Sequence, residues 1–389
     1  MSPIALVLIA LPLLLLGYAY IGYPMILQVA ALFRPRRPLP PPPAAWPFVT
    51  ITVPVYNEQL AIREVLEQLL ALDYPAERRQ ILVISDASTD ATDDIVREFA
   101  PRGVELLRLP SRGGKTAAEN AAAAVASGDI IINVDATTRV PRGSLAALVR
   151  AFSDPEVGVA SGRDVSRAVA AAESTGAESG YVGYEMWVRS LETRVGSIVG
   201  ASGCFYGIRR ELYEPRFPAA LSRDFASALL ARRGGFRAVS VAEAVCIVPR
   251  TPSLQAELQR KVRTMHRGID TLFHMRELMS PRKYGAFALM LLSHKLCRWL
   301  VPLLLPGALV GLTMLSVQSP AVAVLTLAMA IGMAVGGAGM IAARRGYVLP
   351  RPVAVLAFAL LANVAGLLAW REVLGHERSP IWEPTRRTA

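Results

Sequence analysis

The apolar residues gather in long runs at the two ends of the chain, whereas the middle alternates short apolar and polar stretches. The first run extends from about residue 4 to the end of residues 1–33 without a charged side chain, and it can cross roughly 30 Å of hydrocarbon. Because its start is not basic, it is unlike a signal peptide and is predicted to be an uncleaved transmembrane helix. Arg34, Arg36 and Arg37 follow, and such a cluster favours the cytoplasmic side.

Three further apolar runs lie near the other end of the chain, at residues 299–317, 320–343 and 353–370. Residues 299–371 are therefore predicted to form about three transmembrane helices, and Arg344 and Arg345 again favour the cytoplasm. If the third run crosses fully, the basic tail over residues 372–389 lies outside. If that run is re-entrant or interfacial, the tail returns inside, and both arrangements stay open.

Two segments connect these runs to the middle of the chain. Residues 34–46 are basic and rich in proline, which predicts a stiff linker because proline disfavours helix. Residues 253–298 mix basic side chains with apolar ones such as Leu258 and Ile269, which predicts amphipathic helices in the membrane interface. The alternative is an ordinary helix packed on the soluble domain.

Residues 47–252 are predicted to form a soluble domain in which β runs alternate with helical stretches. The predicted strands are residues 48–53, 80–84, 104–108 and 129–134, and the predicted helices are residues 60–72, 92–99 and 116–126. This alternation is typical of βαβ units with a mainly parallel sheet, which binds ligands beyond the carboxyl ends of its strands. Asp86 and Asp135 each follow a predicted strand, so both are expected to face that crevice.

The amino-acid composition limits the classes of function that the chain can have. The chain is 53% hydrophobic and 19% charged, with a formal net charge of +11 from 42 basic and 31 acidic residues. With these apolar runs, the basic balance favours contact with membrane and phosphate, and no motif indicates nucleic acid. The three cysteines have no metal-binding or disulfide spacing, which predicts reduced, cytosolic thiols.

Several short motifs follow one another in the soluble domain: Val53-Pro-Val-Tyr-Asn-Glu58, Ser85-Asp-Ala-Ser-Thr-Asp90, Arg112-Gly-Gly-Lys115, Asn133-Val-Asp135, Gly200-Ala-Ser-Gly203 and Ser222-Arg-Asp224. In this order they resemble a family 2 glycosyltransferase of GT-A fold, of the membrane-embedded branch that includes cellulose, hyaluronan, chitin and poly-N-acetylglucosamine synthases. The resemblance implies an α/β GT-A (Rossmann-like) cytosolic domain, α-helical transmembrane and interfacial helices, and inverting transfer of a sugar from a nucleotide sugar.

The resemblance also implies the residues that bind the donor. Pro54, Tyr56 and Glu58 would hold the nucleoside, with Tyr56 stacked on the base and Glu58 accepting hydrogen bonds. Asp86 would contact the base or ribose, and its alternative role is a turn or helix-cap aspartate. Lys115 precedes a helix in a glycine-flanked loop, which suits contact with phosphate or sugar.

Two aspartates would carry the chemistry. Asp135 resembles the first aspartate of the DxD metal motif, which implies Mg2+ or Mn2+ bound by this carboxylate and the donor diphosphate. Thr137, a neutral hydroxyl, occupies the second position of that motif. Asp224 resembles the catalytic base that takes a proton from the acceptor hydroxyl, and its alternative role is a helix N-cap.

The acceptor side would be the loop that contains Ser202, Gly203 and Cys204, where glycine permits close approach of a sugar. Cys204 has no histidine partner in sight and is interpreted as a packed small residue.

A last motif lies in the amphipathic segment. Arg263 aligns with the arginine of the Gln-x-x-Arg-Trp motif of processive synthases, and it would hold the diphosphate together with Arg260. Thr264 replaces the tryptophan of that motif, which leaves processive or single addition open.

The expected function is transfer from a nucleotide sugar, with UDP favoured by the resemblance, to a polysaccharide or glycolipid acceptor in cell-envelope polysaccharide synthesis. The expected location is the cell (inner) membrane with a cytoplasmic catalytic domain, and membrane lipids are expected partners. The alternatives are single addition to a polyprenyl- or lipid-linked acceptor and a non-catalytic export scaffold. The sugar, linkage, acceptor, export partners and oligomeric state stay open.

Overall fold

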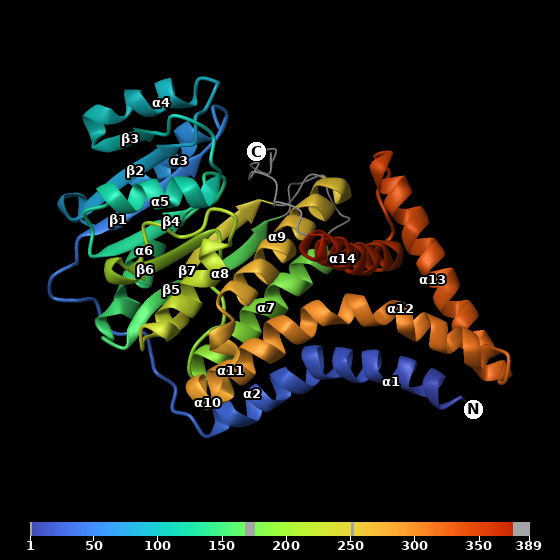
Figure 1. Ribbon diagram of the computed structural model, residues 1–389. Coiled ribbons are helices and arrows are strands. Elements are labelled where there is room, and N and C mark those ends of the chain that lie inside the picture. The colour runs from blue at the N-terminus through green and yellow to red at the C-terminus, as the bar shows by residue number, and fades with distance from the viewer. Residues whose placement is uncertain (1, 168–175, 250–252, 376–389) are drawn as a thin grey trace. The chain divides into compact units, whose positions relative to one another are not determined.

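The structure is a computed structural model whose described residues are 2–167, 176–249 and 253–375. The chain divides into two compact units, whose helices and strands are labelled in Figure 1. Among the described residues, the helical unit comprises 2–33, 176–181 and 253–375, and the sheet unit comprises 34–167 and 182–249. Of the predicted basic tail, residues 376–389 lie outside the described residues.

The sheet unit is built on a seven-stranded sheet with the order β3-β2-β1-β4-β6-β5-β7. The strands are β1 (Val49–Val55), β2 (Arg79–Ser85), β3 (Val104–Arg108), β4 (Ile130–Val134), β5 (Val157–Arg167), β6 (Phe205–Arg209) and β7 (Arg237–Pro249). Strands β1 to β4 pair in parallel, β6 is antiparallel to both β4 and β5, and β7 is parallel to β5. This mainly parallel sheet confirms the predicted fold class. The chain leaves β1 towards β2 and returns to β4 on its other side, which is where such sheets bind ligands.

Helices cover both faces of the sheet. They are α3 (Ile62–Leu70), α4 (Thr92–Glu98), α5 (Lys115–Val125), α6 (Ser144–Arg150) and α8 (Arg223–Arg233), and α7 (Gly176–Val195) contributes to both units. Short 3-10 turns occupy Ala76–Arg78, Ala100–Arg102, Ala151–Ser153 and Arg210–Leu212. Because strand side chains alternate between faces, Ile51 and Val53 join the core beneath α3, α4 and α6, whereas Thr52 faces α5. At the central strands, the face of the sheet that α5 and α8 cover is therefore the more polar of the two faces.

Pro54 lies inside β1, although the sequence predicted that the strand ends at residue 53. Pairing with β2 continues to Val55, whereas pairing with β4 stops at Thr52. Proline lacks an N–H, and the strand tolerates it here because the ladder with β4 has already ended.

The predicted proline-rich linker packs on the sheet unit. Arg150 donates a hydrogen bond of 2.7 Å to the carbonyl of Pro40, and Arg37 forms an ion pair of 2.9 Å with Glu156. Trp46 packs edge-on against Tyr74 and adjoins the hydrophobic core. This segment is therefore part of the domain surface.

Four helices among the described residues are long and apolar enough to cross a membrane: Pro3–Leu32, Ala286–Ser316, Pro320–Arg344 and Arg351–Leu374. The first joins α1 (Pro3–Gly17) and α2 (Tyr23–Leu32) through a π-helical turn at Tyr18–Gly22, and the last two are α13 and α14. Helix α12 packs along α1, where a side chain at Gly311 would meet the carbonyl of Ala5 at 2.8 Å. A small residue at this position permits that close approach.

The second of these helices differs from the prediction, which divided interfacial from transmembrane helices at residue 298. It runs through α11 (Ala286–Leu291), a π-helical turn at Leu292–Leu296 and α12 (Cys297–Ser316). Polar side chains near its middle are buried against the N-terminal helix, where Ser293 bonds Tyr18 at 2.7 Å and Arg298 donates to the carbonyl of Ala19 at 3.4 Å. Satisfied in this way, they do not interrupt the helix.

Helix α9 (Leu254–His274) has the predicted amphipathic pattern, and a 3-10 turn (Arg276–Met279) and α10 (Pro281–Tyr284) follow it. On its apolar side, Ile269 and Leu272 are fully buried within the helical unit. His266 on the same helix lies 2.9 Å from Glu372 of α14, so α9 is tied to one of the long apolar helices.

Candidate active site

Asp86 follows β2 and anchors the loop that starts α5. Its side chain is fully buried, and its two carboxylate oxygens accept hydrogen bonds of 2.7 and 2.8 Å from the N–H groups of Gly113 and Gly114. A Cβ at Gly113 would lie 2.7 Å from that of Ala117, so glycine fits this turn closely. Asp86 thereby fixes Lys115, the first residue of α5, and its direct contact with a donor stays a prediction.

The loops after β1 and β2 are joined to each other. The N–H of Asn57 donates to Ser88 at 3.2 Å, and the N–H of Thr89 donates to the side chain of Asn57 at 2.7 Å. Asn57 and Ala87 both adopt left-handed backbone angles, with φ of 54° and 56°. Such angles are strained for alanine, and strain of this kind gathers at functional loops.

The predicted nucleoside residues lie on this double loop or at its base. Tyr56 is half-buried, and the guanidinium carbon of Arg112 lies 3.9 Å from its ring centroid. The N–H of Glu58 donates to Thr92 at 2.8 Å, which holds the half-buried Glu58 at the start of α4. Pro54 is buried within β1 and supports the loop from below.

Lys115, Asp135 and Gly203 meet at the carboxyl ends of the strands. The Lys115 ammonium lies 2.5 Å from Asp135 Oδ1 and 2.8 Å from the carbonyl of Gly203. The N–H of Asp135 donates to the carbonyl of Cys204 at 3.1 Å, which joins the end of β4 to the loop before β6. Burial alone would lower the pKa of Lys115, but the charges of Asp135, Glu119 and Asp224 outweigh it and raise that pKa, so Lys115 stays charged.

Asp224 joins this group at the start of α8. Ser222 is the N-cap of that helix, so Asp224 is its second residue and the alternative of an N-cap aspartate is wrong. The Ser222 hydroxyl and the N–H of Phe225, the latter at 2.8 Å, donate to Asp224 Oδ1. A Cβ on Gly203 would overlap Asp224 Oδ2, so this glycine lets the acceptor-side loop lie directly against the carboxylate. We call Lys115, Asp135, Gly203 and Asp224 the reaction centre.

The other residues of the acceptor-side loop have structural partners. Ser202 is buried, its hydroxyl donates to Asp164 at 2.5 Å, and its N–H donates to Ser161 at 2.8 Å. Cys204 is half-buried and packs against the hydrophobic core, which matches its interpretation as a packed small residue.

Arg260 and Arg263 lie on α9 of the helical unit. Arg260 makes two hydrogen bonds of 2.8 Å to the buried carboxylate of Glu257, and Arg263 is half-buried one turn further along. The reaction centre itself is built from residues of the sheet unit only.

Few of the described side chains are placed to bind a metal ion. Among the residues that the structure describes, no three His, Cys, Asp or Glu side chains are arranged to hold a metal ion. Asp135 offers a carboxylate, with the half-buried Thr137 two residues further on. Magnesium is commonly bound by one or two carboxylates together with substrate phosphates and water, so these residues fit a cation that arrives with a diphosphate.

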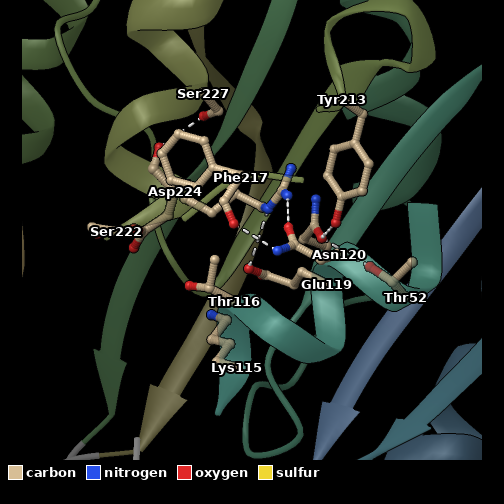
Figure 2. Close-up of polar contacts among 12 residues, drawn as sticks. Thr52, Lys115, Thr116, Glu119, Asn120, Tyr213, Phe217, Ser222, Asp224 and Ser227 are labelled. Carbon is tan, nitrogen blue, oxygen red and sulfur yellow. Dashed lines mark hydrogen bonds and ion pairs between the residues drawn. The ribbon is translucent and has the colours of Figure 1, made fainter. Parts of the chain in front are cut away.

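The sequence did not point to the buried side chains beneath Asp224. Glu119 and Arg223 are both almost fully buried, and Figure 2 shows Glu119, Asn120, Tyr213 and Phe217 around one polar region. Burial raises the pKa of Glu119 to about 7, with Asp224 and Asp135 adding to the rise and Lys115 and Arg223 opposing it. Two signals were available: a basic residue, Arg223, lies inside the motif Ser222-Arg-Asp224, and Glu119 interrupts an alanine-rich helix.

Comparisons with known proteins point to glycosyltransferases. Residues 50–217 match the model of glycosyl transferase family 2. A beta-monoglucosyldiacylglycerol synthase of a Nostoc species is 30% identical over 215 residues, covering 52% of this chain and 45% of that protein. An N-acetylglucosaminyltransferase of a Rhizobium species is 27% identical over 261 residues, covering 61% of this chain and 57% of that protein. The chain thus spans about half the length of these curated relatives.

One solved structure is similar along nearly the whole chain. The mannosyltransferase PcManGT of Pyrobaculum calidifontis, solved in complex with GDP-Man and Mn2+, has a TM-score of 0.72 and 24% identity. The match covers 95% of this chain and 99% of that one, and it shows a shared fold.

Fold and motifs together define the class, a glycosyltransferase domain of GT-A fold. Within that class, residues 50–217 are similar to glycosyl transferase family 2.

Proposed function

We propose that the protein is an inverting glycosyltransferase that moves a sugar from a nucleotide donor to an acceptor hydroxyl. The observation that carries this proposal is the meeting of Lys115, Asp135, Gly203 and Asp224 at the carboxyl edge of the sheet, at 2.5 Å between Lys115 and Asp135 and at 2.8 Å between Lys115 and the Gly203 carbonyl. A cation-binding carboxylate, a fixed ammonium and a second carboxylate are the groups that such a transfer needs.

The proposed step is one displacement. The acceptor oxygen bonds to the anomeric carbon while the bond from that carbon to the donor diphosphate breaks, and Asp224 takes the hydroxyl proton. Attack from the side opposite the leaving group inverts the anomeric carbon. Lys115 stabilises the charge that develops on the diphosphate, because its ammonium is already held in place.

Mg2+ or Mn2+ is the proposed cofactor, held by Asp135 and the diphosphate. When bound, it neutralises charge on the leaving group. The donor would lie on Pro54, Tyr56 and Glu58, with Asp86 supporting the loop of Lys115. The loop of Ser202, Gly203 and Cys204 would face the acceptor.

Arg260 and Arg263 are proposed to bind the diphosphate from α9, where guanidinium groups suit phosphate oxygens. The four long apolar helices support a place in the cell (inner) membrane, with the sheet unit on the cytoplasmic face. Membrane lipids are then direct partners, and no nucleic acid is expected.

The donor is proposed to be a UDP sugar on the strength of the resemblance, and the acceptor a polysaccharide or a glycolipid. A second candidate is a single addition to a lipid-linked acceptor. Thr264 in place of the tryptophan of processive synthases favours it, as does similarity to a beta-monoglucosyldiacylglycerol synthase.

The test is a screen of radiolabelled UDP and GDP sugars with membranes that contain the protein, with and without Mn2+. We expect transfer from one donor, and in Asp224→Asn a loss of about 10²- to 10⁴-fold in rate, because the base is absent. Nucleotide affinity should stay within about threefold of wild type, and Asp94→Asn, an exposed control, should behave as wild type. Unchanged turnover in Asp224→Asn contradicts the proposal, and a ladder of products would favour polymerisation over single addition.

A further inference from the structure

A row of polar side chains crosses the sheet beneath the reaction centre. Thr52 of β1 is in register with Asn133 of β4, and Asn133 is in register with Tyr206 of β6. All three are buried on the face that α5 and α8 cover. Thr52 donates to Asn133 Oδ1 at 2.9 Å, and the Tyr213 hydroxyl donates to the same oxygen at 3.0 Å. The hydrogen bonds of this row therefore extend beyond the sheet to Tyr213.

Arg223 is enclosed above this row. Its side chain is 1% exposed, and its guanidinium carbon lies 4.4 Å from the ring centroid of Tyr213 and 5.3 Å from that of Phe217. It donates to the carbonyl of Glu214 at 2.6 Å and to the side chain of Asn120. The side chains of Asn120, Tyr213 and Phe217 surround this region in Figure 2.

Helix α5 holds the segment that leads to Asp224 at further points. Asn120 donates to the carbonyl of Phe217 at 2.6 Å, and Thr116 donates to that of Leu221 at 3.0 Å. Glu119 lies 3.9 Å from Arg223 Nε, as an ion pair. The helix that starts with Lys115 is therefore bound to the chain immediately before the base.

Stability alone does not explain the buried ion pair of Glu119 and Arg223. Glu119 Oε1 and the Nε and Nη1 atoms of Arg223 have no hydrogen-bond partner among the described residues, and buried polar atoms of this kind cost free energy. Apolar residues of similar volume often stabilise a core as well as a buried ion pair does. What the polar pair adds is a fixed geometry, because stacking and planar donors allow one orientation of the guanidinium.

We propose that Arg223 is a positioning residue for Asp224, which it holds at one place relative to Lys115 by fastening the start of α8 to α5. This inference rests on the proposed function, in which Asp224 is the base. Arg223 itself touches no reacting atom. Its effect should appear in the rate of transfer and should require the Asp224 carboxylate.

The test compares four proteins: wild type, Arg223→Met, Asp224→Asn and the double variant. We expect Arg223→Met to lower kcat by about 100-fold, because small misplacements of a reacting group cost this much, while nucleotide affinity changes less than about threefold. In the Asp224→Asn background the same change should cost less than about threefold. Arg233→Met, which alters an exposed arginine of the same helix, should keep wild-type kcat.

Equal losses in both backgrounds would overturn the inference, because Arg223 would then act without Asp224. A wild-type rate in Arg223→Met would overturn it as well. Full activity in Asp224→Asn would instead contradict the proposed function, because Asp224 would then not be the base that Arg223 positions.

Arg223→Lys keeps the inference open to test if Arg223→Met does not fold. Lysine keeps the charge but loses the planar stacking and the fork of donors, so we expect a folded protein with kcat reduced by about tenfold. A wild-type kcat in folded Arg223→Lys would overturn the role of the guanidinium geometry.

Discussion

Two aspartates that belong to similar short motifs have opposite environments in the sheet unit. Asp86 is fully buried, and backbone N–H groups from one glycine pair occupy both of its oxygens. Asp224 is partly exposed, and both hydrogen bonds described for its carboxylate reach Oδ1, while Oδ2 faces the backbone of Gly203. The first carboxylate holds a loop in place, whereas the second stays partly exposed, as the proposed base must be to reach a substrate hydroxyl. An acidic residue after a strand or before a helix therefore does not reveal its role until its partners are known.

The strongest test of this contrast places a methyl group between the loop of Gly203 and Asp224. Gly203→Ala should lower kcat by about 100-fold, because the new Cβ would overlap Asp224 Oδ2 and move the carboxylate. Steady-state kinetics of transfer would measure this change. Gly143→Ala is the matched control, since no atom lies within 4 Å of a Cβ there, and it should be neutral. A wild-type rate in Gly203→Ala would mean that Asp224 is not held against this loop.

The second prediction concerns Asp86. Asp86→Asn should lower the free energy of unfolding by about 2–3 kcal/mol, because the amide loses a charge-assisted hydrogen bond and turns a donor towards a backbone N–H. The apparent melting temperature in detergent should fall by about 5 °C or more. Asp94→Asn, at an exposed position, should change stability by less than about 0.5 kcal/mol. Equal stability of the two variants would contradict the anchoring role.

The smallest expected effect is a pH dependence from Glu119. Its pKa is raised from 4.5 to about 7 in the fold, so between these values the folded state binds more protons than the unfolded state. Stability from this group is therefore present below about pH 4.5 and is lost as the pH rises to about 7. Glu119→Gln, which stays neutral, should gain melting temperature relative to wild type between pH 5 and pH 8. A constant difference between the two proteins across this range would contradict the raised pKa.

Much of the fold follows from the pattern of the sequence. The β runs and the helices between them occur within a few residues of their predicted ends, because apolar runs of this length and helical periodicity are local signals. Pro54 misled the prediction of β1, since its effect depends on which neighbouring strand still needs a hydrogen bond. The sequence prediction divided the helices at residue 298, but the polar side chains of Ser293 and Arg298 are satisfied by the distant N-terminal helix.

The candidate site shows the same division. Strand ends and motif order indicated Asp135, Lys115 and Asp224, and the structure brings these side chains together. The row of Thr52, Asn133 and Tyr206 depends on register between strands far apart in the chain, which a single sequence does not contain. The burial of Arg223 depends on α5 and on the rings of Tyr213 and Phe217, and no local sequence pattern predicts that they enclose it.

The most direct test of the reaction centre measures Asp224→Asn and Asp86→Asn side by side, for transfer rate at saturating donor, nucleotide affinity and melting temperature. We predict that Asp224→Asn loses transfer by at least about 100-fold with unchanged affinity and melting temperature. Asp86→Asn should instead melt earlier and bind nucleotide more weakly, with a much smaller loss of rate per folded molecule. Fast transfer by Asp224→Asn, or an equal loss of rate in a stable Asp86→Asn, would contradict the assignment of Asp224 as the base.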